Sequence, residues 1–216
     1  PILMYAPGGF NARLEQWTDL GIYKRIKLLD YLPSKYTCII FDRRENGESG
    51  GRVEVVGWSH FVRQGAGLLD ELGFERAHLL GGCMGCPPVT AFGIAHPERV
   101  LSMTLFWPVG GAKYRINCHL RFARHLSFVE ANGMPGVVDL VHSHDLNFSQ
   151  DPRGGPWGNV IRIDDKFATQ YAGSDPVVYK NTVSAMCRGL FDRDTAPGAE
   201  AEELLALDRP SMIVPG

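Results

Sequence analysis

An apolar stretch near the middle of the chain runs without a break into a cluster of glycines. The segment Ala77 to Leu80 has the composition of a buried strand, and Gly81-Gly82-Cys83-Met84-Gly85 follows it at once. A helix-like sequence then continues to about Ala95. A strand, a tight glycine turn and a helix in direct succession constrain the fold strongly, because the residue at the turn must adopt a strained backbone conformation with little space around it.

The spacing of the glycines in this turn places the side chain of a cysteine where it can attack a substrate. Small residues two positions before and two positions after Cys83 avoid collisions, so its side chain stands clear above the sheet. The amide of Met84 faces the same point from the start of the helix, where it can stabilise an oxyanion. A helix N-terminus also favours the thiolate, which is the reactive form of cysteine. The pattern therefore predicts Cys83 as a nucleophile.

The rest of the chain alternates short apolar runs with helix-like stretches. This alternation predicts an α/β fold with a mainly parallel sheet flanked by helices. The expected strands cover 2–5, 37–41, 77–80, 100–106 and 211–214, and the expected helices cover 21–32, 60–72, the stretch up to 95, and 200–207.

Strand-like runs are scarce between residues 110 and 197, which indicates a helical insertion. We therefore expect a core of residues 1–109, a helical cap or lid of residues 110–197, and a return to the core over residues 198–216. Both ends of the sequence are apolar, strand-like runs. From this we expect the fold to be incomplete and the sequence to be part of a larger one.

Composition narrows the classes of partner. The 216 residues carry a formal net charge of -2, which gives no support to nucleic-acid binding or to an anionic membrane surface. No apolar run is long enough to span a bilayer. Five cysteines are an odd number for a disulfide framework, so a cytoplasmic location is expected. No spacing for a metal site or cofactor is present, and the expected partner is a small-molecule substrate.

Four segments, in order, carry a family resemblance. They are Ile2 to Phe10, which looks like a strand and oxyanion loop; Asp42 to Ser49, similar to a D-x-R-G-x-G-x-S loop; the turn at Cys83; and the Ala95 to Val100 segment. Together they resemble the α/β-hydrolase superfamily over nearly the whole chain. The layout is similar to the lidded group that includes proline iminopeptidases and lactone or C–C-bond hydrolases.

The resemblance implies a function and further site residues. It implies hydrolysis or transfer of an acyl group of an ester, lactone, thioester or amide. It also implies a second oxyanion donor at the Gly9 amide, with Phe10 as its neighbour, and an apolar pocket under the lid with Trp107 near its floor. Trp157, in a glycine-rich loop of the lid, is a further candidate for substrate contact.

Three departures from the family pattern are visible in the sequence. Pro7 stands where histidine is usual, Glu45 replaces a glycine, and Cys83 replaces serine. In this family the acid and the histidine of the triad follow the last strand of this sequence, so we expect both beyond residue 216.

Two other functions remain open from the sequence. The chain could be an inactive hydrolase-fold binding protein, a reading that Pro7 and the expected lack of a base support. It could instead be a thiol redox protein, because Cys83 and Cys86 form a C-x-x-C pair at the start of a helix. For Asp42, Arg43 and Arg44 we expect an ion pair that fixes a loop, and for Lys113, Tyr114 and Arg115 a solvated face.

Overall fold

Five parallel strands form one sheet, as the α/β prediction requires. The computed structural model describes all residues from 1 to 216. The strands run in the order β2-β1-β3-β4-β5. Their bounds are β1 Ile2–Tyr5, β2 Cys38–Ile40, β3 Ala77–Gly82, β4 Val100–Phe106 and β5 Ser211–Val214.

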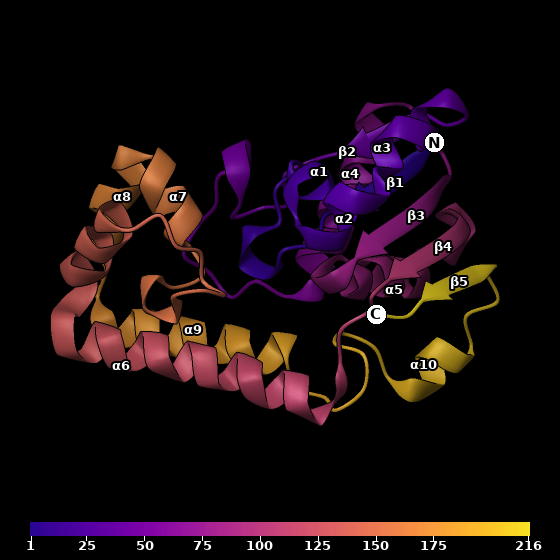
Figure 1. Cartoon of the computed structure of the whole chain (residues 1–216). Helices are drawn as coiled ribbons and strands as arrows, with labels where there is room; N and C mark the ends of the chain where they lie inside the picture. The colour runs from indigo at the N-terminus through magenta and orange to yellow at the C-terminus, as the bar shows by residue number, and fades with distance from the viewer.

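Helices cover both faces of this sheet (Figure 1). Leu3 and Tyr5 of β1 belong to the larger apolar cluster, which includes residues of α4 (Trp58–Glu71) and α5 (Cys86–Ala95). Ile2 and Met4 belong to a second cluster with residues of α1 (Gln16–Asp19) and α2 (Gly21–Ile26). Alternate strand residues therefore face opposite helical layers, as the period of two in a strand requires.

The single helix predicted over 21–32 is two helices. Lys27 has a left-handed backbone with φ of 55° and separates α2 from α3 (Leu28–Tyr31). The amide of Lys27 still bonds to the carbonyl of Tyr23, so it closes the last turn of α2. A non-glycine residue in this conformation gives no clear signal in the sequence, because the apolar spacing continues across it.

After β4 the chain builds a layer made only of helices, which we call the helical segment (residues 111–190). It contains α6 (Gly111–Ser143), α7 (Gly158–Ile163), α8 (Asp165–Ala172) and α9 (Pro176–Leu190). In Figure 1, α6 and α9 lie along one another below the sheet domain, and α7 and α8 stand at their far end. Gly133, with φ of 70°, interrupts the regular backbone of α6.

The chain returns to the sheet through α10 (Ala201–Leu205) and β5. Strand β5 pairs in parallel with β4 at the edge of the sheet. Short 3-10 turns complete the structure: η1 Gly9–Asn11, η2 Leu32–Ser34, η3 Gly47–Ser49, η4 Cys83–Gly85, η5 Pro97–Arg99 and η6 Pro152–Gly154. None of the helices combines the length and apolar character needed to cross a bilayer.

Candidate active site

Cys83 occupies the sharp turn between β3 and α5 that the sequence predicts. Gly82 is still extended, Cys83 has a left-handed backbone with φ of 50°, and the helix begins immediately afterwards. Few non-glycine residues adopt a positive φ, and those that do are concentrated at functional sites. The strain at Cys83 holds its side chain at the end of the central strand, outside the sheet.

The glycines around Cys83 are required by close contacts with the backbone. A Cβ on Gly81 would collide with the carbonyl of Gly85, and a Cβ on Gly85 would collide with the carbonyl of Tyr5. A Cβ on Gly82 would lie 2.9 Å from Cζ of Tyr23. The turn therefore closes on itself and packs against Tyr5 and Tyr23 only when these positions carry no side chain.

Cys83 opens onto a cavity of about 410 Å³ between the sheet domain and the helical segment. This volume lies in the range that suits a small-molecule ligand. The lining comes from the loop after β1, the turn at Cys83, helix α6 and the loop after α6; it consists of Gly8, Gly9, Phe10, Asn11, Gln16, Leu20, Cys83, Met84, Tyr114, Cys118, Arg121, Phe122, Asn147, Phe148, Ser149 and Gln150.

The predicted oxyanion donors line this cavity together with Cys83. Met84 is the second residue of η4, and Gly9 and Phe10 are the first two residues of η1. Backbone amides in the first turn of a helix have no partner within the helix. The structure thus brings the three residues that carry the predicted donors to the cavity that Cys83 lines.

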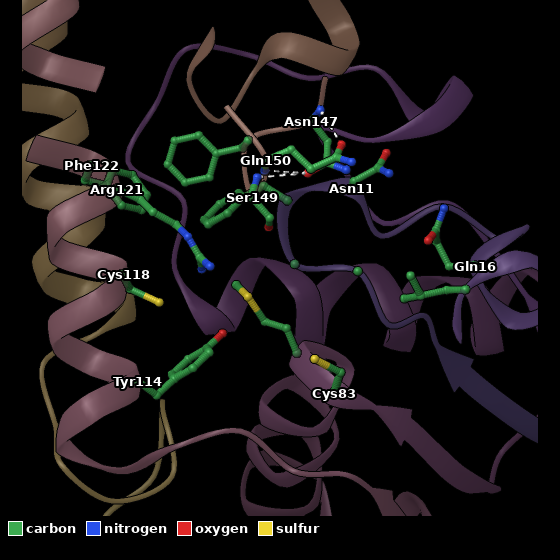
Figure 2. Close-up of a pocket in the computed structure, with 16 residues that line it drawn as sticks. Asn11, Gln16, Cys83, Tyr114, Cys118, Arg121, Phe122, Asn147, Ser149 and Gln150 are labelled. Atoms are coloured by element: carbon green, nitrogen blue, oxygen red, sulfur yellow. Dashed lines mark hydrogen bonds between the residues drawn. The ribbon is translucent and has the colours of Figure 1, made fainter. Parts of the chain in front are cut away.

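Helix α6 supplies a wall of the cavity that the sequence did not reveal. Tyr114, Cys118 and Arg121 are spaced so that they share one face of the helix. Figure 2 shows the Tyr114 hydroxyl, the Cys118 sulfur and the Arg121 guanidinium directed toward the space beside Cys83. The expectation of a solvated face at Tyr114 is therefore wrong: burial raises the pKa of its hydroxyl well above the ordinary value.

Arg121 carries a positive charge at the cavity that no carboxylate neutralises. It takes part in none of the ion pairs of the structure. No aspartate, glutamate or histidine lines the cavity. An unpaired guanidinium in a partly apolar pocket favours a ligand with a carboxylate or similar anion, because the guanidinium fork can bind two anionic oxygens at once.

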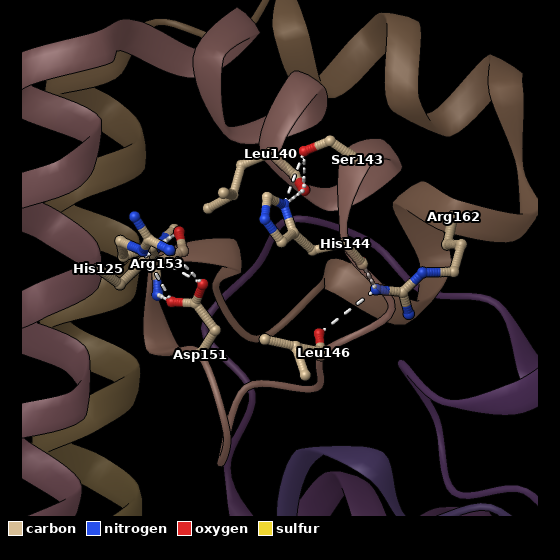
Figure 3. A network of polar contacts seen from close by, with 8 residues as sticks. All are labelled: His125, Leu140, Ser143, His144, Leu146, Asp151, Arg153 and Arg162. Atoms are coloured by element: carbon tan, nitrogen blue, oxygen red, sulfur yellow. Dashed lines mark hydrogen bonds and ion pairs between the residues drawn. The ribbon is translucent and has the colours of Figure 1, made fainter.

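The loop that follows α6 closes the cavity on one side. Asn147 forms a turn in which its side-chain oxygen accepts hydrogen bonds from the amides of Ser149, at 2.9 Å, and Gln150, at 3.2 Å. Arg162 of α7 holds the start of the loop by donating to the carbonyls of His144 and Leu146 (Figure 3). These bonds keep the cavity-lining part of the loop in a defined position.

The helical segment is also tied directly to the loop that carries Gly9 and Phe10. The side-chain amide of Asn159 donates to the carbonyl of Phe10 at 3.0 Å and to the side-chain oxygen of Asn46 at 3.2 Å. The same oxygen of Asn46 accepts from the amide of Ala12 at 3.1 Å. The ring of Phe10 lies edge-on to those of Phe122 and Phe148. Polar and aromatic contacts therefore join the two walls of the cavity.

The two tryptophans expected to contact substrate lie outside the cavity lining, which corrects that expectation. Trp157 is completely buried in the interior of the helical segment, with its ring 5.8 Å from that of Tyr179. Trp107 has a left-handed backbone with φ of 56° at the end of β4, and its ring lies against Gly216. Aromatic residues in a loop give the same sequence signal whether they enter a core or a pocket, so the sequence could not separate the two.

Cys86 is placed differently from Cys83. It is buried, and its sulfur donates to the carbonyls of Gly81, at 3.2 Å, and Phe106, at 3.6 Å. Burial raises the pKa of this thiol to about 12. Cys83 and Cys86 are both free thiols. The environment of Cys86 suppresses its thiolate, which weighs against a redox pair at this turn.

The seven histidines and the acidic residues form no cluster that could hold a metal. His125 is buried in the helical segment, where Nδ1 bonds to the carbonyl of Arg153 and Nε2 lies 2.6 Å from the hydroxyl of Tyr179. His119 bonds to the carbonyl of Phe191, and His142 to that of Ile161. These histidines therefore serve contacts within the helical segment.

Known proteins resemble this chain in sequence and identify its fold family. Residues 1–112 match the family model described as alpha/beta hydrolase fold. Over 102 residues the chain is 31% identical to the dihydrolipoyllysine-residue acetyltransferase component of the acetoin cleaving system from Cupriavidus necator. The matched region covers 47% of this chain and 25% of the relative. It is 24% identical to 3-oxoadipate enol-lactonase 1 from Acinetobacter baylyi over 92% of this chain and 66% of the relative. The chain thus spans from a quarter to about two thirds of the length of these relatives.

A solved structure shows the same fold. The enol-lactonase from Burkholderia xenovorans LB400 superposes with a TM-score of 0.57 at 17% identity, over 100% of this chain and 72% of that one. The likeness extends across the sheet domain and the helical segment, because it covers the whole chain.

Proposed function

Because the chain belongs to the alpha/beta hydrolase fold family, we propose that it transfers the acyl group of a small ester, lactone, thioester or amide to water through Cys83. One observation carries this proposal: Cys83 holds a left-handed backbone at a strand-to-helix turn and lines a cavity with Met84 and Gly9. A buried cysteine with a packing role needs neither the strain nor the surrounding glycines.

The proposed reaction has two steps. The thiolate sulfur of Cys83 attacks the carbonyl carbon, and the carbonyl oxygen gains the negative charge. The Met84 amide and an amide of Gly9 or Phe10 stabilise that charge, and losing one such donor typically costs about 100-fold to 1000-fold in rate. The bond between the carbonyl carbon and the leaving group then breaks, the leaving group takes a proton from water to replace the thiol proton released to water when the thiolate formed, and a thioester remains on Cys83. Water hydrolyses this thioester to a carboxylic acid and restores the Cys83 thiol.

The cavity favours an acyl compound that carries a carboxylate. Arg121 supplies an unpaired cation, and the rings of Phe10, Phe122 and Phe148 supply an apolar surface. The name of the 3-oxoadipate enol-lactonase relative describes a substrate of this kind for that protein. In this proposal the helical segment acts as the lid that separates the substrate from bulk water, and Arg121 anchors the anion while Cys83 attacks.

A binding protein without turnover is the second candidate. It is favoured by the composition of the cavity lining, which contains no histidine or carboxylate to act as a base. A protein of this kind would bind an anionic acyl compound but form no thioester on Cys83.

The experiment uses p-nitrophenyl acetate and mass spectrometry of the intact chain. We expect release of p-nitrophenol together with one acetyl group attached to Cys83, located by fragmentation of the peptide. The Cys83→Ala variant should lose this adduct, and the matched Cys86→Ala variant should keep it. Absence of any adduct on Cys83 in the unmodified chain would reject the nucleophile proposal and favour the binding protein, whereas loss in both variants would favour the thiol pair.

A further inference from the structure

Arg43 is a buried cation directly beneath the turn that carries Cys83. Its side chain is among the largest that are fully buried, and it belongs to none of the ion pairs of the structure. Its Nε has no hydrogen-bond partner. Burial lowers the pKa of the guanidinium to about 10, so the charge is retained at neutral pH. A buried charge without a counter-ion is costly, and the sequence-based expectation of a loop-fixing ion pair does not explain it.

The two ends of the guanidinium reach the two halves of the candidate oxyanion hole. One terminal nitrogen donates to the carbonyl of Met84 at 3.1 Å, and the other donates to the carbonyl of Gly9. The guanidinium also lies over the ring of Phe61, 4.9 Å from its centroid. Arg43 therefore joins the turn at Cys83 to the loop after β1, two segments that the chain itself does not connect.

The bond to Gly9 also orients an amide. In a planar trans peptide the C=O and N–H groups point in opposite directions. Because Arg43 holds the carbonyl of Gly9, the N–H of Phe10 in the same peptide unit points away from the guanidinium. Loss of the guanidinium would free this peptide to rotate and would leave the Met84 and Gly9 carbonyls without their donor.

The charge of Arg43 also acts on the ionisable groups around it. Those that raise its pKa are Tyr114 from the helical segment, Glu45 from its own loop, Cys83 from the turn and Tyr5 from β1. Burial raises the pKa of Tyr114, and likewise of Tyr5, so both phenols stay neutral at pH 7. Neither phenol therefore supplies an anion that balances the charge of Arg43.

We propose that Arg43 is a positioning residue that fixes the oxyanion hole by bridging the carbonyls of Gly9 and Met84. This inference rests on the proposed role of Cys83. It assigns the orientation of the backbone donors to the forked geometry of one side chain.

Two substitutions separate charge from geometry. Arg43→Lys keeps a cation but cannot bridge two carbonyls with a rigid fork, and Arg43→Met removes both. The matched control is Arg44→Met, since Arg44 is the next residue in the loop and pairs with Glu45 and Glu54 instead. Circular dichroism and urea unfolding establish that each variant is folded before its reactivity is compared.

The first readout is the rate at which iodoacetamide alkylates Cys83 from pH 5.5 to 9.5, and the second is the rate of acylation by p-nitrophenyl acetate. Arg43→Met and Arg43→Lys should both slow acylation about 100-fold, because neither side chain can bridge the two carbonyls with a rigid fork. The alkylation of Cys83 in Arg43→Lys should keep the pH profile of the unmodified chain. Arg44→Met should change neither.

The proposal is overturned if folded Arg43→Met or Arg43→Lys acylates at the unmodified rate. If Arg43→Met does not fold, Arg43→Lys alone still tests the proposal. A merely structural role of Arg43 would not slow the acylation of Cys83 while its alkylation stays unchanged. Failure of the role of Cys83 itself looks different: the unmodified chain would then show no preferred alkylation or acylation at Cys83.

Discussion

Gly85 lies so close to the carbonyl oxygen of Tyr5 that the structure has no room for a Cβ between them. This contact joins the first turn after Cys83 to the neighbouring strand β1. It explains why the sequence keeps a glycine two residues after the cysteine, and it makes the position sensitive to a single methyl group.

Gly85→Ala should therefore destabilise the fold by about 1 to 3 kcal/mol, in the range of overpacked core positions, and should lower the reactivity of Cys83. Gly67→Ala is the matched control, because Gly67 lies in α4 with nothing near its Cβ position and alanine is the better helix former by about 1 kcal/mol. Urea unfolding measures both. Equal stability of the two variants would contradict the close contact.

Arg121→Gln should change the preference for substrate charge. We expect kcat/KM for the anionic ester p-nitrophenyl hemisuccinate to fall about 10-fold to 100-fold, the range of a lost charged hydrogen bond, while the neutral ester p-nitrophenyl acetate changes little. Arg124→Gln, an exposed arginine of the same helix, is the control. Equal losses for the two esters in Arg121→Gln would show that Arg121 does not bind the anion.

Glu45 makes stability depend on pH near neutrality. Burial, the largest cause, raises the pKa of its carboxyl to about 7 even though Arg44 opposes the shift. The folded state therefore holds the proton at pH values where the unfolded chain has lost it, so stability falls as the pH rises from about 4.5 to about 7. Each pKa unit corresponds to about 1.4 kcal/mol.

Glu45→Gln should remove this dependence and raise the free energy of unfolding at pH 8 by about 1 to 3 kcal/mol. Glu48→Gln, an exposed position in the same loop, should leave the pH profile as it is. The measurement is urea unfolding at pH 5, 6, 7 and 8. A Glu45→Gln variant that is less stable than the unmodified chain at pH 8 would mean that the ion pair with Arg44 outweighs the burial.

The effect of His125 on the pH dependence of stability is opposite to that of Glu45. Burial lowers the pKa of its imidazole to about 4, below the value of about 6.5 in an unfolded chain. The unfolded state then binds more protons, so stability is lost as the pH falls from about 6.5 to about 4. His125→Gln should flatten this acid limb of the unfolding profile, whereas His96→Gln, at a partly exposed position, should preserve it. An unchanged acid limb in His125→Gln would show that other groups cause the loss of stability at acid pH.

The sheet was predictable because its signal is local. The strands at 2–5, 100–106 and 211–214 have the bounds that their apolar runs indicate. The turn at Cys83 was predictable for the same reason, since strand, glycines and helix are consecutive. The break at Lys27 was not, because nothing in its neighbourhood demands a left-handed residue.

The residues that form the walls of the cavity could not be predicted from the sequence, for a different reason. Arg121 and Tyr114 face Cys83 only because helix α6 crosses the end of the sheet, which is a tertiary arrangement. Arg43 looked like part of an ion pair with its neighbours, yet its guanidinium bonds two distant carbonyls. Trp157 fills the interior of the helical segment, and its loop position suggested a pocket.

The most direct test compares all five cysteines in one experiment. Burial raises the pKa of the other four thiols, to about 12 at Cys86 and Cys187 and to a smaller extent at Cys38 and Cys118. Cys83 instead lines the cavity at the start of a helix, close to Arg43.

The measurement is alkylation by iodoacetamide at pH 7, followed at each cysteine by peptide mass spectrometry, with the urea-unfolded chain as the control in which the five thiols should react alike. In the folded chain we expect Cys83 to react at least about tenfold faster than any other cysteine, because it lines the cavity whereas burial raises the pKa of the other four thiols. If Cys83 reacts no faster than Cys38 or Cys118, the fold stands but Cys83 is not an activated nucleophile.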